Sequence, residues 1–166
     1  FEPGRIYDVV YRARDPRVVG VCLAGTRDLI SFFKHATAAD GNPAPGLRHA
    51  IGWGVSQTGR FLRHFVYDGF NEDEQGRRVF DGVFDQVGGA GRGSFNHRFG
   101  QQSRDELQHF NIQYPVDMFP FTDDDQTDPV SGATDGLLAR ARRTNTVPRV
   151  VHLLTNSEYF NRAGSL

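Results

Sequence analysis

The chain has 166 residues, of which 38% are hydrophobic, and its formal net charge at pH 7 is -1. This is enough for one domain with a hydrophobic core, and the near-zero charge argues against nucleic-acid binding. A single cysteine, Cys22, excludes an internal disulfide and a cysteine-based zinc site, and no apolar run approaches the ~20 residues that span a bilayer. The sequence therefore predicts no nucleic-acid or membrane partner, no metal and no cofactor.

The first predicted helix follows a short extended segment at residues 7–11. Asp15 and Pro16 form a helix-start signal, with the aspartate as N-cap and the proline in the first turn. The apolar residues that follow recur with a 3.6-residue period and form one stripe: Val18, Val19, Cys22, Thr26, Leu29, Ile30 and Phe33. We expect this helix to pack on a sheet face and to end before the Pro- and Gly-rich loop at residues 41–46.

A strand and a second helix come next, joined by a serine. Residues 49–53 predict a short buried strand. Residues 57–67 predict a helix whose apolar side comprises Phe61, Leu62, Phe65 and Val66. The polar residues 71–78 predict a solvated surface connection or a short helix. Residues 79–87 predict a second strand, which runs into a Gly-rich turn at residues 88–93.

The remaining third of the chain contains a long irregular excursion, predicted at about residues 110–130 from its aromatic, Pro-containing and acidic composition. Before it, residues 103–106 fit a capping box and predict a short helix. After it, residues 134–144 predict a helix that points Leu137, Leu138 and Ala141 inward. Residues 149–154 predict a third strand.

Strands separated by helical segments predict βαβ units and a parallel sheet, so the fold class is α/β. Ligands bind at the carboxyl ends of such strands, where Ser56 and the segments after Val87 and Leu154 are expected to meet. Three strands make a small sheet, and the chain does not begin with methionine. We therefore expect residues 1–166 to form one partial domain, completed by the remainder of the same polypeptide or by another chain.

Ser56 lies where the predicted strand becomes a helix, between Gly54 and Gly59. In a nucleophile elbow, a serine on such a sharp turn holds its hydroxyl clear of the sheet. The N–H of Gln57 can then donate to the oxyanion of a tetrahedral intermediate, assisted by the helix dipole. Thr58 stands where the G-x-S-x-G pattern has its second glycine. The alternative interpretation is that Ser56 is an ordinary helix N-cap.

Four segments carry a family resemblance: residues 54–63, 69–74, 79–82 and 89–99. Together they resemble the uncharacterised bacterial family called "alpha/beta hydrolase domain", and the resemblance runs along nearly the whole chain. It implies the α/β-hydrolase fold and a serine esterase or related acyl hydrolase acting on a small-molecule ester. The serine turn is also similar to that of glucuronoyl esterases, where an arginine replaces Gln57. This departure argues against a uronate ester as the substrate.

The α/β-hydrolase chain order is nucleophile, then acid, then histidine. The resemblance assigns the acid to the segment after the third strand, where Glu158 is the matching carboxylate. A surface glutamate is the alternative interpretation, and four aspartates of the excursion are further candidates: Asp117, Asp123, Asp125 and Asp128. None of the six histidines fits the order. The resemblance therefore implies a histidine base beyond Leu166 and a second oxyanion donor in a preceding loop.

Two residues of the Gly-rich segment after the second strand are candidate substrate contacts. His97 could reach the active-site edge, and Arg92 could hold a substrate carboxylate or pair with a nearby aspartate. The sequence thus predicts a serine hydrolase with its base outside the chain. A non-catalytic binding or assembly module of the same fold is the alternative.

Overall fold

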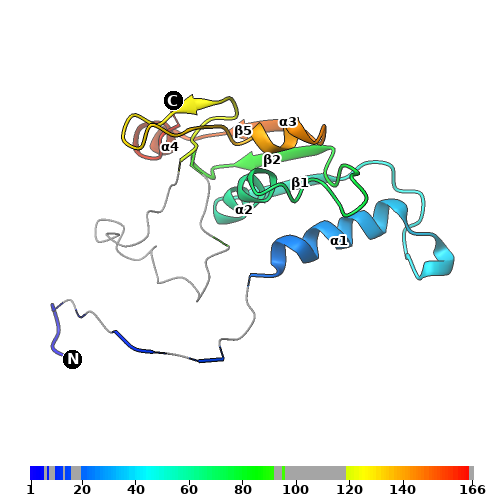
Figure 1. Cartoon of the computed structure of the whole chain (residues 1–166), viewed down its shortest axis with the longest axis horizontal. Helices are drawn as coiled ribbons and strands as arrows, with labels where there is room; N and C mark the ends of the chain where they lie inside the picture. Colours follow the sequence, from blue (N-terminus) through cyan, green and yellow to red (C-terminus); the bar gives the residue numbers. More distant parts are fainter. Residues whose placement is uncertain are drawn as a thin grey trace.

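The computed structural model describes residues 1–5, 7, 10–12, 14–15, 20–91, 95 and 119–164. Within this part of the chain, a parallel three-stranded sheet has the order β1 (Ile51–Val55), β2 (Gly82–Gln86) and β5 (Arg149–Leu153) (Figure 1). The register aligns Gly54, Asp85 and His152 across the three strands. The α/β fold with a parallel sheet, predicted from the order of the elements, is confirmed.

Helices and a small antiparallel hairpin precede, connect and follow these strands. In chain order they are α1 (Cys22–His35), η1 (Ala38–Asp40), α2 (Gln57–Tyr67), β3 (Gln126–Thr127), β4 (Thr134–Asp135), α3 (Ala139–Arg143) and α4 (Asn156–Asn161). The bounds of α2 agree with the prediction because its apolar period and its stop signal are both local. Among the helices of the described residues, none is long and apolar enough to cross a membrane.

The hydrophobic core lies between α2 and one face of the sheet. Its buried members are Leu23, Leu62, Phe65, Val66, Val79, Phe80, Val83 and Ala141. Phe65 is fully buried, and its ring centroid lies 5.4 Å from that of Phe80 in an edge-to-face contact. Burying one side chain of this size contributes roughly 1.5–3 kcal/mol, so this cluster is what fixes α2 against β1 and β2.

The opposite face of the sheet is apolar and open in the described part of the chain. Along β1, Gly52 and Gly54 are buried, while Ile51, Trp53 and Val55 are exposed. In register with them on β5 are two further exposed apolar residues, Val151 and Leu153. The prediction that the first strand is buried is therefore correct for one face only. Its buried face carries only glycines, because α2 passes too close for larger side chains.

Helix α1 differs from its prediction in start and in orientation. It begins at Cys22, and its predicted first turn at residues 16–19 lies outside the described residues. Leu23 is fully buried, whereas Cys22 and Leu29, both in the predicted stripe, are exposed. The inward face also carries Lys34, whose Nζ lies 2.9 Å from an Asp81 carboxylate oxygen. The predicted stripe is therefore confirmed only in part: Ile30 packs against the core, but the helix also packs through polar contacts that the stripe did not include.

The helix predicted at residues 134–144 is shorter in the structure. Residues 134–135 form β4, and only Ala139–Arg143 are helical. The Leu137 N–H donates to the Thr122 carbonyl at 2.9 Å, so a tertiary hydrogen bond replaces a helical one. Leu137 and Ala141 are nevertheless buried, as predicted.

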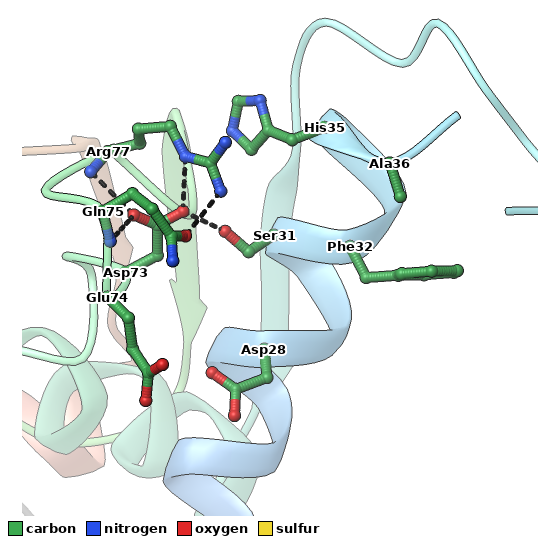
Figure 2. Close-up of a pocket in the computed structure, with 9 residues that line it drawn as sticks. All are labelled: Asp28, Ser31, Phe32, His35, Ala36, Asp73, Glu74, Gln75 and Arg77. Carbon is green, nitrogen blue, oxygen red and sulfur yellow. Dashed lines mark hydrogen bonds and ion pairs between the residues drawn. The ribbon is translucent and has the colours of Figure 1, made fainter. Parts of the chain in front are cut away.

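The connection at residues 71–78 lies at the surface, as predicted, with residues 74–76 and 78 exposed, but Asn71 and Asp73 within it are buried, which was not predicted. The Asp73 side chain is 2% exposed and accepts backbone N–H bonds from Gln75 at 3.0 Å and Arg77 at 2.8 Å. It also accepts from Arg77 Nε at 2.8 Å and from the Ser31 hydroxyl of α1 (Figure 2). Burial alone raises the pKa of Asp73, but these hydrogen bonds outweigh it and lower the pKa to about 2.

Replacement of Asp73 by asparagine is expected to cost about 1–2 kcal/mol of unfolding free energy at neutral pH. This figure is reduced from the full pKa shift because water reaches the pocket that Asp73 lines. Because the folded pKa lies below the ordinary 3.8, the stabilisation is present above pH 3.8 and is lost as the pH falls toward 2. Urea unfolding between pH 2 and 7 measures both effects.

The matched control for this prediction is Asp28→Asn. Asp28 lines the same pocket, but its side chain is 59% exposed (Figure 2). We expect a change within about 0.5 kcal/mol for this variant, since exposed ion pairs contribute little. Equal losses of unfolding free energy in the two variants would contradict a specific stabilising role of Asp73.

Candidate functional site

Ser56 connects the last residue of β1 to the first residue of α2. Its backbone angles are φ 55° and ψ -118°, in a region that favours glycine, so the turn is strained. The Ser56 N–H donates to the Gln86 carbonyl at 2.8 Å, and its carbonyl accepts from the Arg60 N–H at 3.1 Å. Among the described residues, its side chain makes no capping hydrogen bond to α2. Ser56 does not act as an ordinary N-cap.

Glycines on both sides of Ser56 allow the strand and the helix to pass each other closely. A Cβ atom on Gly54 would lie 2.6 Å from the backbone nitrogen of Gly59, well inside van der Waals contact. A Cβ atom on Gly59 would overlap the buried carboxylate of Asp85. The two small residues that the sequence placed beside the serine are therefore required by the geometry of the crossing.

Thr58 occupies the position where the G-x-S-x-G pattern has a glycine. Its hydroxyl accepts a hydrogen bond from the Val55 N–H and donates one to the Val55 carbonyl, both at 2.8 Å. The side chain thus ties the first turn of α2 to the end of β1. Gly59, one position later, provides the close contact instead.

A pocket of about 490 Å³ opens beside Ser56 at the carboxyl edge of the sheet. Its described lining residues are Ser56, Arg60, Val87, Gly88, Thr155, Ser157, Glu158, Asn161 and Arg162. These come from three segments: the β1–α2 turn, the end of β2, and α4 with the residues that flank it. The prediction that these three segments meet at one edge of the sheet is confirmed.

Glu158 lies in this pocket, in the first turn of α4. It is 9% exposed, and its Oε2 accepts hydrogen bonds from the Thr155 N–H at 2.8 Å and from the Thr155 hydroxyl at 2.7 Å. This capping box fixes the carboxylate, so the alternative of an exposed surface glutamate was wrong. The sequence prediction missed α4 itself. The signal for it was the Thr155-x-x-Glu158 spacing, which is typical of a helix start.

Of the other predicted site residues, the structure describes some and leaves others outside the described ranges. Gln57 is the first residue of α2, and its N–H is one of the amides that have no intrahelical acceptor. Arg92 and His97 lie outside the described residues, as does Asp117. No histidine occurs among the described residues that line the pocket. In the described ranges, no group of three or more His, Cys, Asp or Glu side chains could hold a metal ion.

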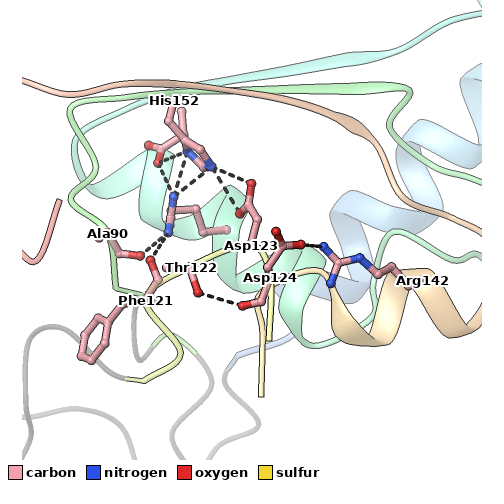
Figure 3. A network of polar contacts seen from close by, with 9 residues as sticks. Ala90, Phe121, Thr122, Asp123, Asp124, Arg142 and His152 are labelled. Carbon is pink, nitrogen blue, oxygen red and sulfur yellow. Dashed lines mark hydrogen bonds and ion pairs between the residues drawn. The ribbon is translucent and has the colours of Figure 1, made fainter. Parts of the chain in front are cut away.

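A charged cluster around Arg63 was not predicted from the sequence. The side chains of Arg63 and Asp85 are buried, whereas those of His152 and Asp123 are 27% and 32% exposed. Arg63 Nη1 lies 2.8 Å from His152 Nδ1 and 3.3 Å from Asp85 Oδ2, while its Nη2 donates to the Ala90 carbonyl (Figure 3). His152 Nε2 lies 3.2 Å from Asp123 Oδ2. We call Arg63, Asp85, His152 and Asp123 the Arg63 cluster. It ties the chain at Ala90 and Asp123 to the sheet and to α2.

The Arg63 cluster shifts the pKa values of two members in opposite directions. Burial and the charge of Arg63 lower the pKa of His152, but hydrogen bonds with Asp123 and Asp85 outweigh them and raise it above the ordinary 6.5. Burial raises the pKa of Asp123, but the hydrogen bond with His152 and the nearby positive charges hold it below the ordinary 3.8.

The stability of the protein is therefore expected to depend on pH through this pair. The raised pKa of His152 gives stabilisation that is complete below pH 6.5 and is lost as the pH rises through the folded value. The lowered pKa of Asp123 gives stabilisation that is present above pH 3.8 and is lost on acidification. The contribution of the pair is largest between these values, and urea unfolding from pH 5 to 9 will show the alkaline loss.

In the variant His152→Gln, the loss of stability at alkaline pH is expected to disappear. The control is His49→Gln, because the His49 side chain is 79% exposed and its Nδ1 lies 3.8 Å from Asp81 Oδ2, ahead of the first residues of β1 and β2. The control should retain the loss seen in the wild-type protein. An unchanged pH profile in His152→Gln would contradict the assignment.

Comparison with known proteins gives one match. A family model described as "Alpha/beta hydrolase domain" matches residues 3–166, which include Ser56 and Glu158. No curated protein and no solved structure matches the chain.

Proposed function

Because the chain belongs to the alpha/beta hydrolase domain family, we propose that it is a serine hydrolase that cleaves a carboxylic ester of a small molecule. The observation that carries this proposal is the strained backbone of Ser56, at φ 55° between a strand and a helix. Strain of about 1–3 kcal/mol persists where the surrounding structure imposes it, and such residues cluster at functional sites. Here the strain holds a serine hydroxyl at the edge of a pocket.

In the proposed reaction, Ser56 Oγ attacks the ester carbonyl carbon while an imidazole from outside the described residues accepts its proton. The carbonyl oxygen becomes an oxyanion beside the N-terminus of α2, where the Gln57 N–H donates to it. One such donor contributes about 2.7–4 kcal/mol of transition-state stabilisation. The imidazolium then protonates the departing alkoxide, and water hydrolyses the acyl-enzyme by the same steps in reverse.

Glu158 is the proposed acid. A triad carboxylate accepts a hydrogen bond from the imidazole N–H and stabilises the imidazolium that forms. The two hydrogen bonds from Thr155 hold the Glu158 carboxylate in one orientation within the pocket that Ser56 lines. This pre-organisation supports the role.

A non-catalytic module of the same fold is the second candidate. The observation that favours it is that no described residue lining the pocket is a histidine. A serine without a base is a weak nucleophile at neutral pH. Binding without turnover would then be the function of the pocket.

Labelling with a fluorophosphonate, which reacts covalently with activated serines, separates the two candidates. The intact protein is expected to be labelled, and Ser56→Ala is expected to lose the label. Ser157→Ala is the matched control, because Ser157 lines the same pocket and should be dispensable for labelling. Absence of labelling in the intact, folded protein would overturn the hydrolase proposal and favour the binding module.

A further inference from the structure

Val87, the first residue after β2, has a strained backbone beside the pocket that Ser56 lines. Its φ is 50°, in a region that favours glycine, and such a value is a genuine outlier for a β-branched residue. Of the non-glycine residues with positive φ in the described part of the chain, Ser56 and Val87 are the two that line this pocket. Two strained residues therefore meet at one site.

Val87 is also the neighbour of Ser56 across the carboxyl edge of the sheet. The register pairs Val55 of β1 with Gln86 of β2, and the Ser56 N–H donates to the Gln86 carbonyl at 2.8 Å. Because this carbonyl belongs to the peptide bond between Gln86 and Val87, only that peptide group lies between the two strained residues. The pocket thus begins with Val87 on one side of the serine.

The surrounding structure imposes the conformation of Val87. On the side of β1, the Gln86 carbonyl is fixed by Ser56, and on the side of β5, the Val87 N–H donates to the Leu153 carbonyl at 2.7 Å. The next residue, Gly88, passes so close to the fully buried Asp85 side chain that a Cβ atom there would lie 2.2 Å from Asp85 Oδ1. The segment is held on both sides and from below, so it cannot shift to relieve the strain.

The side chain of Val87 does not contribute to the hydrophobic core. Val87 is partly buried, yet it is not among the partly buried apolar residues that pack against the core in the described part of the chain. It is the one aliphatic side chain among the described lining residues of the pocket. Glycine would adopt φ 50° without steric cost. A strained valine beside the proposed nucleophile therefore points to a contact with the substrate.

We propose that Val87 limits the length of the acyl group that Ser56 accepts, so that the protein cleaves esters of short-chain acids. This inference rests on the proposed function. In the acyl-enzyme, the acyl carbon is bonded to Ser56 Oγ, so the acyl group must fit beside the serine turn in both steps of the reaction. Ligand pockets that hold apolar groups are lined mainly by hydrophobic and aromatic side chains. The other described lining residues here are polar, charged or glycine, which does not match a long acyl chain.

The test compares 4-nitrophenyl esters of acetic, butyric and hexanoic acid, which share one leaving group. The intact protein is expected to cleave the acetate with a kcat/KM at least about 10-fold above that for the hexanoate, since a few methylene groups without space in a pocket have effects of this size.

Three variants change the space beside Ser56. Val87→Gly removes the side chain and the strain, whereas Val87→Ala removes most of the side chain and keeps the strain. Both are expected to shift the hexanoate-to-acetate ratio of kcat/KM toward the hexanoate by about 10-fold or more. Val87→Leu, with a longer side chain, should shift the ratio in the opposite direction. Because glycine fits this φ, Val87→Gly is expected to fold.

Val151→Ala is the matched control. It removes the same groups from the exposed face of β5, outside the described lining of the pocket, and should keep the wild-type ratio. A second series varies the alcohol instead of the acid: methyl, butyl and hexyl acetate, with acid release followed in a pH-stat. Val87→Gly is expected to leave the ratios within this series unchanged.

An unchanged hexanoate-to-acetate ratio in Val87→Gly and Val87→Ala would overturn the inference, because a turn with a purely structural role alters stability but not acyl preference. An equal shift in the alcohol series would also overturn it. Fluorophosphonate labelling of the same preparations distinguishes this failure from that of the proposed function. If Ser56 is labelled but the acyl preference does not depend on Val87, only the role of Val87 is wrong. If Ser56 of the intact protein is not labelled, the hydrolase proposal itself fails.

Discussion

Replacement of Ser56 by alanine is expected to lower kcat/KM for ester hydrolysis by about 10³- to 10⁶-fold, the range seen when a serine nucleophile is removed. The physical reason is that no other hydroxyl stands on the strained turn between β1 and α2. The measurement is the initial rate of ester hydrolysis by the intact protein. Ser157→Ala, in the same pocket, should remain within a few-fold of wild type.

The strain at Ser56 gives this variant a second, independent readout. Glycine adopts the Ser56 conformation without steric cost, whereas alanine does not. Ser56→Gly is therefore expected to be about 1 kcal/mol more stable than Ser56→Ala in urea unfolding, and both should be inactive. Equal stability of the two variants would contradict the assignment of strain, even if both lose activity.

Placing alanine at Gly54 is expected to cost about 3 kcal/mol of unfolding free energy or more. Its Cβ would lie 2.6 Å from the backbone nitrogen of Gly59, and backbone atoms of a packed helix cannot move aside cheaply. Gly59→Ala is also expected to destabilise, because its Cβ would overlap the fully buried Asp85 carboxylate. The gain in helix propensity, up to about 1 kcal/mol, does not offset this overlap.

The control for these substitutions is Gly25→Ala in α1. Gly25 is also helical, but nothing lies within 4 Å of a Cβ placed there. This variant is expected to gain about 0.5–1 kcal/mol from helix propensity alone. Urea unfolding of all three variants compares a glycine-to-alanine substitution where the added Cβ has free space with the same substitution where the Cβ overlaps neighbouring atoms. Similar effects at Gly25 and Gly59 would show that Gly59 of α2 does not lie as close to the Asp85 carboxylate of β2 as described.

Features that depend on neighbouring residues were predicted well from the sequence. The strand, the serine turn and α2 follow from a β-prone run, two glycines and an apolar period within residues 51–67. Such patterns report directly on local backbone geometry. The parallel sheet and the meeting of three segments at its carboxyl edge also followed, because the alternation of strands and helices restricts the topology.

Features that depend on distant partners were not predicted. Asp73 was interpreted as solvated, yet it is buried against Ser31, which lies 42 residues away in the chain. None of the six histidines fitted the α/β-hydrolase chain order, and the contact between His152 and Arg63, 89 residues apart in the chain, was not predicted. The hydrogen-bond partner of a polar side chain decides whether it can be buried, and a single sequence does not reveal that partner.

The sequence by itself thus determined the fold class, the strained serine turn and the glycines that it requires, because each is set by residues adjacent in the chain. Only the tertiary structure decided the surroundings of Ser56. It fixed the Glu158 carboxylate through Thr155, placed Arg60 and Arg162 in the lining of the same pocket, and assembled the Arg63 cluster. The physical reason is that packing of α2, β2 and α4 brings these charges together, and their separations along the chain carry no periodic signal.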